Sequence, residues 1–379
     1  MKIALVYDLL YPYSIGGVEI RNYQLAKFLS KRHEVHLYGV KMWKGNNTIN
    51  DGKLILHGVC RYKDKYSFSG NRRISDVLKF SVKLKKELEK EKFDLVDCTA
   101  FPYFPAFVCN DYCKRNNVPL VVTWHEVWDN YWFERLKILG IVGKFIERQV
   151  SRLSKNNLVV SRKTGKDLAR LNKNKKGIFG VNNWVDFSEI KKTKPSKLSS
   201  DIIFAGRHLK HKNINILIKT LVLVKKKYQK VKLIIIGNGP ETENLKLLTR
   251  KLKLQDNVTF FDFFKEHSDV IALMKSSKIF VLPSTLEGFG ISVIEANACS
   301  LPCIVVESEK NAAVSLVKNN KTGFVVELNK WNIAKKIIYL LDNEKKRNEF
   351  GREAFRFSKQ FDEDKVMPKI EGYYKGLMK

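Results

Sequence analysis

The feature that most constrains the fold is an alternation of short β-branched runs with longer amphipathic segments. Apolar runs in the first half lie at residues 3–7, 35–40, 54–59, 95–98, 120–124, 158–161 and 177–181. Between several of these runs, apolar residues recur at helical spacing over 18–30, 74–90 and 133–153. Runs that are apolar throughout are typical of strands buried on both faces. The pattern therefore predicts an α/β fold with a parallel sheet covered by helices.

The same alternation starts again after a polar segment at 188–200. New apolar runs follow at residues 202–205, 233–236, 258–261, 279–282, 304–307 and 324–327. A chain of 379 residues is also too long for one ordinary domain and suits two. We therefore predict two doubly wound domains, 1–185 and 186–361, followed by a helix over 362–379.

Charge restricts the partners but does not select one. The chain has 70 Lys and Arg residues against 39 Asp and Glu residues, a formal net charge of +31. Such a chain is attracted to nucleic acid, an anionic membrane or a phosphorylated substrate, unless the excess merely reflects a Lys-rich composition. The basic residues are spread over both halves and no nucleic-acid motif is present, so a nucleic-acid partner is the least favoured of these.

The sequence offers no evidence for a metal site or a membrane span. Neither Cys-x-x-x-Cys pair has the Cys or His partners of a zinc site. The only Asp-x-Asp, beginning at Asp362, opens the final helical segment, where acidic residues are common. No apolar run approaches the ~18 residues of a membrane span, and the N-terminus is apolar for too few residues to be a signal peptide. We expect a cytoplasmic protein, soluble or peripheral, without metal or cofactor.

Two features of the first domain lie at the ends of predicted strands, where α/β sheets bind ligands. Gly16 and Gly17 precede a predicted helix, so backbone N–H groups there could approach an anion, although a plain tight turn is the favoured interpretation of the two glycines alone. His125 follows the run 120–124 and could bind a hydroxyl group. The alternative is a histidine whose ring is satisfied by the backbone.

The second domain places cations and glycines after its first two strands. Arg207 and Lys212 follow the run 202–205. The planar guanidinium of arginine and the compact ammonium of lysine both suit a pyrophosphate. A basic, solvent-facing turn is the alternative. Gly237 and Gly239 follow the run 233–236. They either let the backbone approach a nucleotide or form a simple turn from strand to helix.

The most informative stretch follows the run 279–282. Glu287 precedes Gly288-Phe289-Gly290, which opens a helix, and Glu295 lies within that helix among apolar residues. The glycines can bring amide groups to an anion, and a carboxylate can accept two hydroxyl donors of a ribose. Because a carboxylate on an apolar helix is unfavourable without a partner, we predict a functional rather than a structural role for Glu295.

This stretch resembles the signature of retaining glycosyltransferases of family GT4, which have the GT-B fold of two Rossmann-like domains facing across a cleft. The resemblance covers essentially the whole chain. Further matching elements are Gly16-Gly17, His125, Arg207 with Lys212, and the turn Gly237-Asn238-Gly239-Pro240-Glu241. Departures are Asn213 where glycine is usual, His211 where an acidic residue is frequent, and Trp184 in place of glycine between the domains.

The resemblance implies metal-independent transfer of a sugar, with retention, from a UDP- or GDP-sugar to a glycan or lipid-linked acceptor. By that resemblance Arg207 and Lys212 hold the pyrophosphate and Glu295 the ribose, while Glu287 and the amides of 288–290 position the donor sugar. Such an enzyme is of the hexosyltransferase type. In the usual mechanism that the resemblance implies, a phosphate oxygen of the donor takes the proton from the attacking hydroxyl group of the acceptor.

The remaining implied roles are positional. Glu287 and His125 are the candidate catalytic residues, both as positioning groups, and Gly16, Gly17 and Gly237 join the donor site. The first domain binds the acceptor, and the helix over 362–379 crosses back onto it. A nucleotide-sugar epimerase or a phosphorylase on a similar scaffold is the alternative enzyme.

The segment 133–153 leaves the membrane question open. It combines apolar residues at helical spacing with Lys137, Lys144, Arg148 and Arg152. A basic amphipathic helix can lie on an anionic membrane. The favoured interpretation is an ordinary domain helix with its apolar face turned inward.

Overall fold

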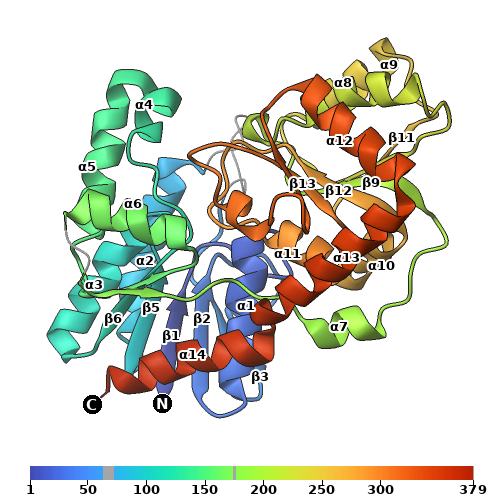
Figure 1. The fold of residues 1–379 in the computed structure, drawn as a ribbon. Helices are drawn as coiled ribbons and strands as arrows, with labels where there is room; N and C mark the ends of the chain where they lie inside the picture. Colours follow the sequence, from blue (N-terminus) through green and yellow to red (C-terminus); the bar gives the residue numbers. More distant parts are fainter. Residues whose placement is uncertain (63–71, 174–175, 379) are drawn as a thin grey trace. The chain divides into compact units, whose positions relative to one another are not determined.

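The computed structural model describes residues 1–62, 72–173 and 176–378, and the chain divides into two compact units (Figure 1). The first unit comprises residues 1–183 together with 367–379, and the second comprises 184–366. Each contains a parallel sheet with helices on its faces. The predicted α/β class with two Rossmann-like domains is confirmed.

The first unit contains an eight-stranded sheet in the order β3-β4-β2-β1-β5-β6-β7-β8. The strands are β1 Lys2–Val6, β2 Glu34–Gly39, β3 Thr48–Asp51, β4 Leu54–Gly58, β5 Leu95–Thr99, β6 Leu120–Trp124, β7 Asn156–Val159 and β8 Ile178–Gly180. All neighbours pair in parallel except β3 and β4. The apolar runs do not predict β3, because this edge strand is largely exposed and carries a single apolar residue.

The helices of the first unit follow the strands. They are α1 Gly17–Ser30, α2 Ile74–Leu88, α3 Phe104–Asn116, α4 Tyr131–Leu136, α5 Gly140–Val150 and α6 Arg162–Asn172. None of the helices in the described parts of the chain is long and apolar enough to cross a membrane.

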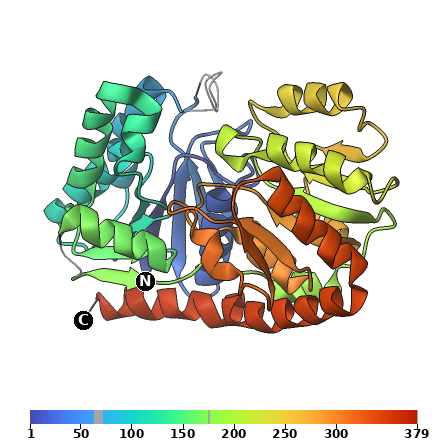
Figure 2. The same cartoon turned by 45° about the horizontal axis from the view of Figure 1, so that its top comes forward.

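The last helix, α14 Glu363–Gly376, belongs to the first unit from Met367 onward. Figure 2 shows it at the lower left of the drawing. Its Tyr374 hydroxyl donates to the buried carboxylate of Asp97 on β5, and the ring of Tyr373 stacks on Phe179 at a centroid distance of 4.2 Å. Glu371 contacts His33 Nε2 at 3.0 Å. A buried polar contact and an aromatic stack thus attach the C-terminus to the sheet.

The structure corrects the prediction of one helix over 133–153. A 3₁₀ turn, Lys137–Leu139, separates α4 from α5, and Lys137 has a φ of 52°. α4 and α5 lie close together. A Cβ on Gly143 would lie only 2.4 Å from the ring of Trp132, so glycine at this position permits the close approach. The favoured inward orientation is wrong for Ile141, Val142 and Phe145, which face solvent, whereas Val150 of the same helix is buried.

The second unit contains a six-stranded parallel sheet in the order β11-β10-β9-β12-β13-β14. Its strands are β9 Ser200–Ala205, β10 Leu233–Ile236, β11 Val258–Phe261, β12 Ser277–Leu282, β13 Cys303–Val306 and β14 Gly323–Val326. This is the 3-2-1-4-5-6 order of dinucleotide-binding folds. The central strands consist almost entirely of buried residues, which explains their uninterrupted apolar sequences.

Helices cover both faces of the second sheet. They are α7 Phe187–Lys192, α8 Ile214–Lys225, α9 Thr242–Lys251, α10 His267–Lys275, α11 Ile291–Ala298, α12 Lys330–Asp342 and α13 Glu344–Ser358. α8, α9 and α12 pack together on one face, while α10, α11 and α13 cover the other (Figure 1). β9 and β12 are adjacent, so the chain leaves these neighbouring strands toward opposite sides of the sheet.

Candidate active site

The reversal of strand order between β9 and β12 creates a switch point in the second unit. Open α/β sheets bind ligands outside the carboxyl ends of the strands at such a point. Arg207 and Lys212 follow β9, while Glu287 and the start of α11 follow β12. The tertiary structure therefore brings together at one sheet edge residues that the sequence separates by about 75 positions.

A direct ion pair joins the two loops at this edge. Lys212 Nζ lies 2.6 Å from Glu287 Oε1, and both side chains are mostly buried. Asn213 next to it donates from Nδ2 to the carbonyls of His211 at 3.0 Å and of Pro283 at 3.1 Å. The cation after β9 and the carboxylate after β12 are thus held in contact by backbone anchors on either side.

Asn213 also has an explanation in its backbone conformation. Its φ is 52°, in the left-handed region that glycine adopts freely and asparagine tolerates better than most residues. The replacement of the usual glycine by asparagine therefore preserves the turn. It also adds an amide side chain that ties the loop to Pro283.

The loop that carries Glu287 is fixed to the end of β13. The Glu287 backbone N–H donates to Lys310 O at 3.0 Å, and Ala312 N–H donates to Glu287 O at 2.9 Å. Asn311 donates from Nδ2 to Ser284 O at 3.0 Å and to Val306 O at 2.7 Å. These bonds fix the backbone from which the Glu287 side chain extends.

α11 begins directly beyond a strained glycine. Gly290 has a φ of 102°, and a Cβ there would lie 2.7 Å from the Cβ of Ala313. Only glycine combines this conformation with this close approach. The position therefore requires glycine. The N-terminus of α11, which follows it, has backbone N–H groups and the positive end of the helix dipole, and both favour an anion.

Glu295 has a partner that the sequence did not reveal. Its Oε1 lies 3.0 Å from His267 Nε2, and the other ring nitrogen, Nδ1, lies 2.8 Å from Glu189 Oε2. Burial lowers the pKa of His267, but Glu295 and Glu189 outweigh burial and raise it to about 10. The imidazolium at neutral pH therefore lies between two carboxylates. A single histidine at the start of α10 matches no motif, so sequence reasoning had no signal for it.

The glycines after β10 serve the packing of the loop after β9. A Cβ on Gly237 would lie 2.1 Å from Gly206 O, and one on Gly239 would lie 2.5 Å from His208 O. Burial lowers the pKa of His208 to about 4, and its Nδ1 contacts Thr242 Oγ1 at 2.9 Å. Close backbone packing thus accounts for both glycines without a ligand.

The remaining predicted residues lie in the first unit. Gly16 is the N-cap of α1 in an extended conformation, and a Cβ there would lie 2.5 Å from Glu19 Oε2. His125 follows β6, and its Nε2 is buried without a hydrogen-bond partner in the described structure. Burial, and to a smaller extent Arg21, hold the pKa of His125 well below its usual range, so the ring is neutral. A neutral ring with one unused nitrogen can donate to or accept from a ligand hydroxyl.

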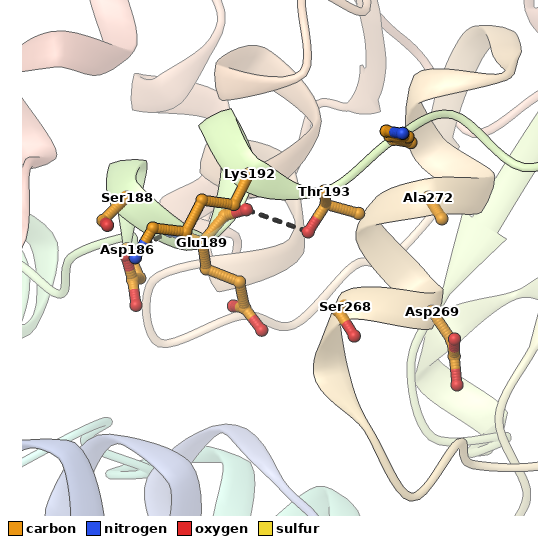
Figure 3. A pocket seen from close by; sticks show the side chains of 9 residues that line it. Asp186, Ser188, Glu189, Lys192, Thr193, Ser268, Asp269 and Ala272 are labelled. Carbon is orange, nitrogen blue, oxygen red and sulfur yellow. Dashed lines mark hydrogen bonds between the residues drawn. The ribbon is translucent and has the colours of Figure 1, made fainter.

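A pocket in the second unit lies between α7 and the start of α10 (Figure 3). Glu189, Lys192 and Asp269 are among its lining residues, whereas Arg207, Lys212, Glu287 and Glu295 are not. Glu189 nevertheless connects this pocket to Glu295 through His267. Within the described residues no group of three or more His, Cys, Asp or Glu side chains could hold a metal ion.

Two family models together match most of the chain. One, described as Glycosyl transferases group 1, matches residues 186–357, and the other, Glycosyltransferase Family 4, matches residues 15–189. The chain belongs to the group 1 glycosyltransferases of the family 4 type. It is therefore an enzyme of the glycosyltransferase class.

Curated relatives support this assignment. An uncharacterized glycosyltransferase of Haemophilus influenzae is 26% identical over 375 residues, which cover 96% of this chain and 97% of the relative. The capsular polysaccharide biosynthesis glycosyltransferase CapM of Staphylococcus aureus is 31% identical over 61% of each chain. The N,N'-diacetylbacillosaminyl-diphospho-undecaprenol alpha-1,3-N-acetylgalactosaminyltransferase of Campylobacter jejuni is 26% identical over 47% of this chain and 45% of the relative.

Solved structures establish the GT-B fold of this glycosyltransferase. Sucrose-phosphate synthase from Thermosynechococcus elongatus has a TM-score of 0.85 at 18% identity, covering 99% of this chain and 98% of that one. HepE of Anabaena, in complex with UDP and glucose, has a TM-score of 0.76 at 17% identity and covers 99% and 100%.

Proposed function

We propose that this glycosyltransferase transfers a sugar from a UDP- or GDP-sugar with retention of configuration and without a metal ion. The observation that carries the proposal is the Lys212–Glu287 contact of 2.6 Å at the switch point beside the start of α11. A cation, a carboxylate and a helix N-terminus at one sheet edge match the charges of a nucleotide-sugar. The fold shared with HepE, whose structure contains UDP and glucose, supports the same ligand class.

In this proposal, different residues of the second unit bind different parts of the donor. Arg207 and Lys212 bind the pyrophosphate, and the positive end of α11 adds to them as charge grows on the leaving nucleoside diphosphate. Glu295 accepts from the ribose hydroxyls. Glu287 and the amides of 288–290 orient the sugar, so that no metal is needed to stabilise the departing charge.

The Lys212–Glu287 pair has a specific consequence for donor binding. In the structure each group neutralises the other, so neither charge is left alone in a largely buried site. A donor pyrophosphate that takes Lys212 leaves the Glu287 carboxylate to accept from a sugar hydroxyl. The ion pair thereby keeps both side chains in position until the donor exchanges partners with them.

The first unit binds the acceptor in this proposal. His125 contributes a neutral nitrogen for a sugar hydroxyl as a positioning residue, and a phosphate oxygen of the donor takes the acceptor's proton. A glycan or lipid-linked acceptor is supported by relatives named for capsular polysaccharide and for a diphospho-undecaprenol substrate. The described cysteines are all free thiols, which suits a cytoplasmic enzyme.

The test measures donor binding and turnover with a panel of UDP- and GDP-sugars. We expect Glu295→Ala to weaken donor binding by about tenfold or more, because a charged group loses its hydrogen bonds to the ribose. Glu344→Ala, which removes a mostly exposed carboxylate in the same unit, is the matched control. Equal donor affinity in the Glu295→Ala variant and the wild type contradicts the ribose role.

Metal independence and stereochemistry are tested separately. Nucleoside diphosphate release that depends on the sugar donor should be unchanged by EDTA, and the product should have the anomeric configuration of the donor. Loss of turnover with EDTA and recovery with Mn²⁺ contradicts the metal-free proposal, and an inverted product contradicts retention.

A further inference from the structure

The α4–α5 hairpin exposes an apolar surface that no part of the described chain covers. We call the set formed by Phe133, Leu136, Ile138, Leu139, Ile141, Val142 and Phe145 the hairpin patch. Ile138, Leu139 and Phe145 are 86%, 69% and 62% exposed. The surface of a soluble protein seldom exposes so many large apolar side chains within thirteen residues. Such a patch commonly marks a docking site.

Unlike an ordinary domain helix, α5 turns three large apolar side chains to solvent and a carboxylate inward. Its inner face contains the carboxylate of Glu147, which is fully buried, while Ile141, Val142 and Phe145 face outward. Glu147 accepts from Tyr103 Oη at 2.7 Å and from the backbone N–H groups of Trp128 at 2.7 Å and Asp129 at 2.8 Å. A rotation that turned the apolar face inward would break all three bonds.

Close packing also fixes the position of the hairpin. A Cβ on Gly140 would lie 2.5 Å from Trp132 O, and one on Gly143 would lie 2.4 Å from the Trp132 ring. Because glycines allow this approach, α5 rests directly on α4. The hairpin patch therefore lies on two helices that pack closely against each other.

The charges around the patch favour an anionic partner. Residues 133–152 contain five basic and two acidic residues, and of the two acidic residues Glu147 is buried while Glu134 is exposed. Lys137 and Arg152 are exposed, and Lys144 lies 2.7 Å from Asp129. A protruding apolar surface bordered by cations combines the two attractions that hold amphipathic helices at anionic membranes.

We propose that the hairpin patch docks this enzyme on the surface of an anionic lipid bilayer, with Lys137 and Arg152 near the head groups. A second copy of the chain fits less well, because a stable dimer interface generally takes about 20–30 residues from each side and would also bring the two sets of cations together. The docking is independent of the proposed donor chemistry, since it uses residues outside the switch-point site.

The test is co-sedimentation or flotation of the full chain with phosphatidylcholine vesicles with and without phosphatidylglycerol. We expect binding only to the anionic vesicles and a decrease with added salt. Lys137→Gln with Arg152→Gln should weaken partitioning by about 25-fold, at about fivefold for each cation. Ile138→Ser with Leu139→Ser and Phe145→Ser should reduce it by about tenfold or more.

The control is Leu247→Ser with Trp331→Ser, which removes comparably exposed apolar side chains from the second unit and should leave partitioning unchanged. Thermal unfolding of every variant checks that the fold is intact. The proposal is overturned if the wild type binds neither vesicle, if the hairpin variant binds as tightly as the wild type, or if sedimentation shows a dimer that only the hairpin variant loses. Donor binding, measured in parallel without vesicles, should be the same in all variants, so a failure here is distinct from a failure of the proposed function.

Discussion

We expect the contact between His267 and Glu295 to make the stability of the second unit depend on pH. His267 lies between Glu295 on α11 and Glu189 on α7, at 3.0 and 2.8 Å. We expect replacement by glutamine, which keeps hydrogen-bonding capacity without the charge, to remove this dependence. Cys299, on the same side of α11, does not titrate in the relevant range, because burial raises the pKa of its thiol to about 12.

The magnitude follows from the pKa of His267 in the two states. Raising it from about 6.5 in the unfolded chain to about 10 in the folded protein corresponds to about 4–5 kcal/mol in favour of folding. This contribution is fully present below pH 6.5, because the unfolded chain is then protonated as well. It is lost as the pH rises toward 10, where the folded protein releases the proton. Between pH 6.5 and 9.5 the loss is about 3–4 kcal/mol.

The measurement is urea unfolding at pH 6.5, 8.0 and 9.5, fitted as two transitions because a chain of two compact units does not in general unfold in a single two-state transition. The stability advantage of the wild type over His267→Gln should shrink steadily across this series. His57→Gln is the control: burial lowers the pKa of His57 to about 4, so its ring stays neutral throughout. An advantage that stays constant from pH 6.5 to 9.5 refutes the charged state assigned to His267.

Two further substitutions test the packing. Tyr374→Phe removes a hydrogen-bond donor to the buried Asp97 carboxylate. The change should lower the free energy of unfolding of the first unit by about 1–3 kcal/mol in urea unfolding. Unchanged stability would contradict a role for this bond in attaching α14. Gly290→Ala should destabilise the second unit by about 1–2 kcal/mol from φ alone, plus the clash with Ala313. Adding Ala313→Gly should recover only the clash, and full recovery would disprove the backbone strain.

Sequence patterns predicted the parts of the fold in which burial is uniform. Strands such as β9 and β12 are buried on both faces, so their sequences are apolar throughout. The pattern failed at β3, whose edge position leaves it exposed. It also failed over 133–153, where helical spacing does not reveal the turn at Lys137 or which face of α5 points inward.

The candidate site was predicted in its parts. Glu287, Glu295, Arg207 and Lys212 were identified from their residue types and their places after apolar runs. Their roles toward a donor remain predictions. His267 could not be identified, since its importance comes only from the two carboxylates that lie beside its ring.

The sequence by itself determined the α/β class, the two domains and the chemical types of the groups after the strands, because these depend on local patterns of burial and spacing. Only the tertiary structure decided which distant groups meet: Lys212 with Glu287, His267 with Glu295, and Tyr374 with Asp97. It also decided that Ile141, Val142 and Phe145 of α5 are exposed. Such pairings depend on the order of strands and on the rotation of each helix about its own axis, which no local pattern specifies.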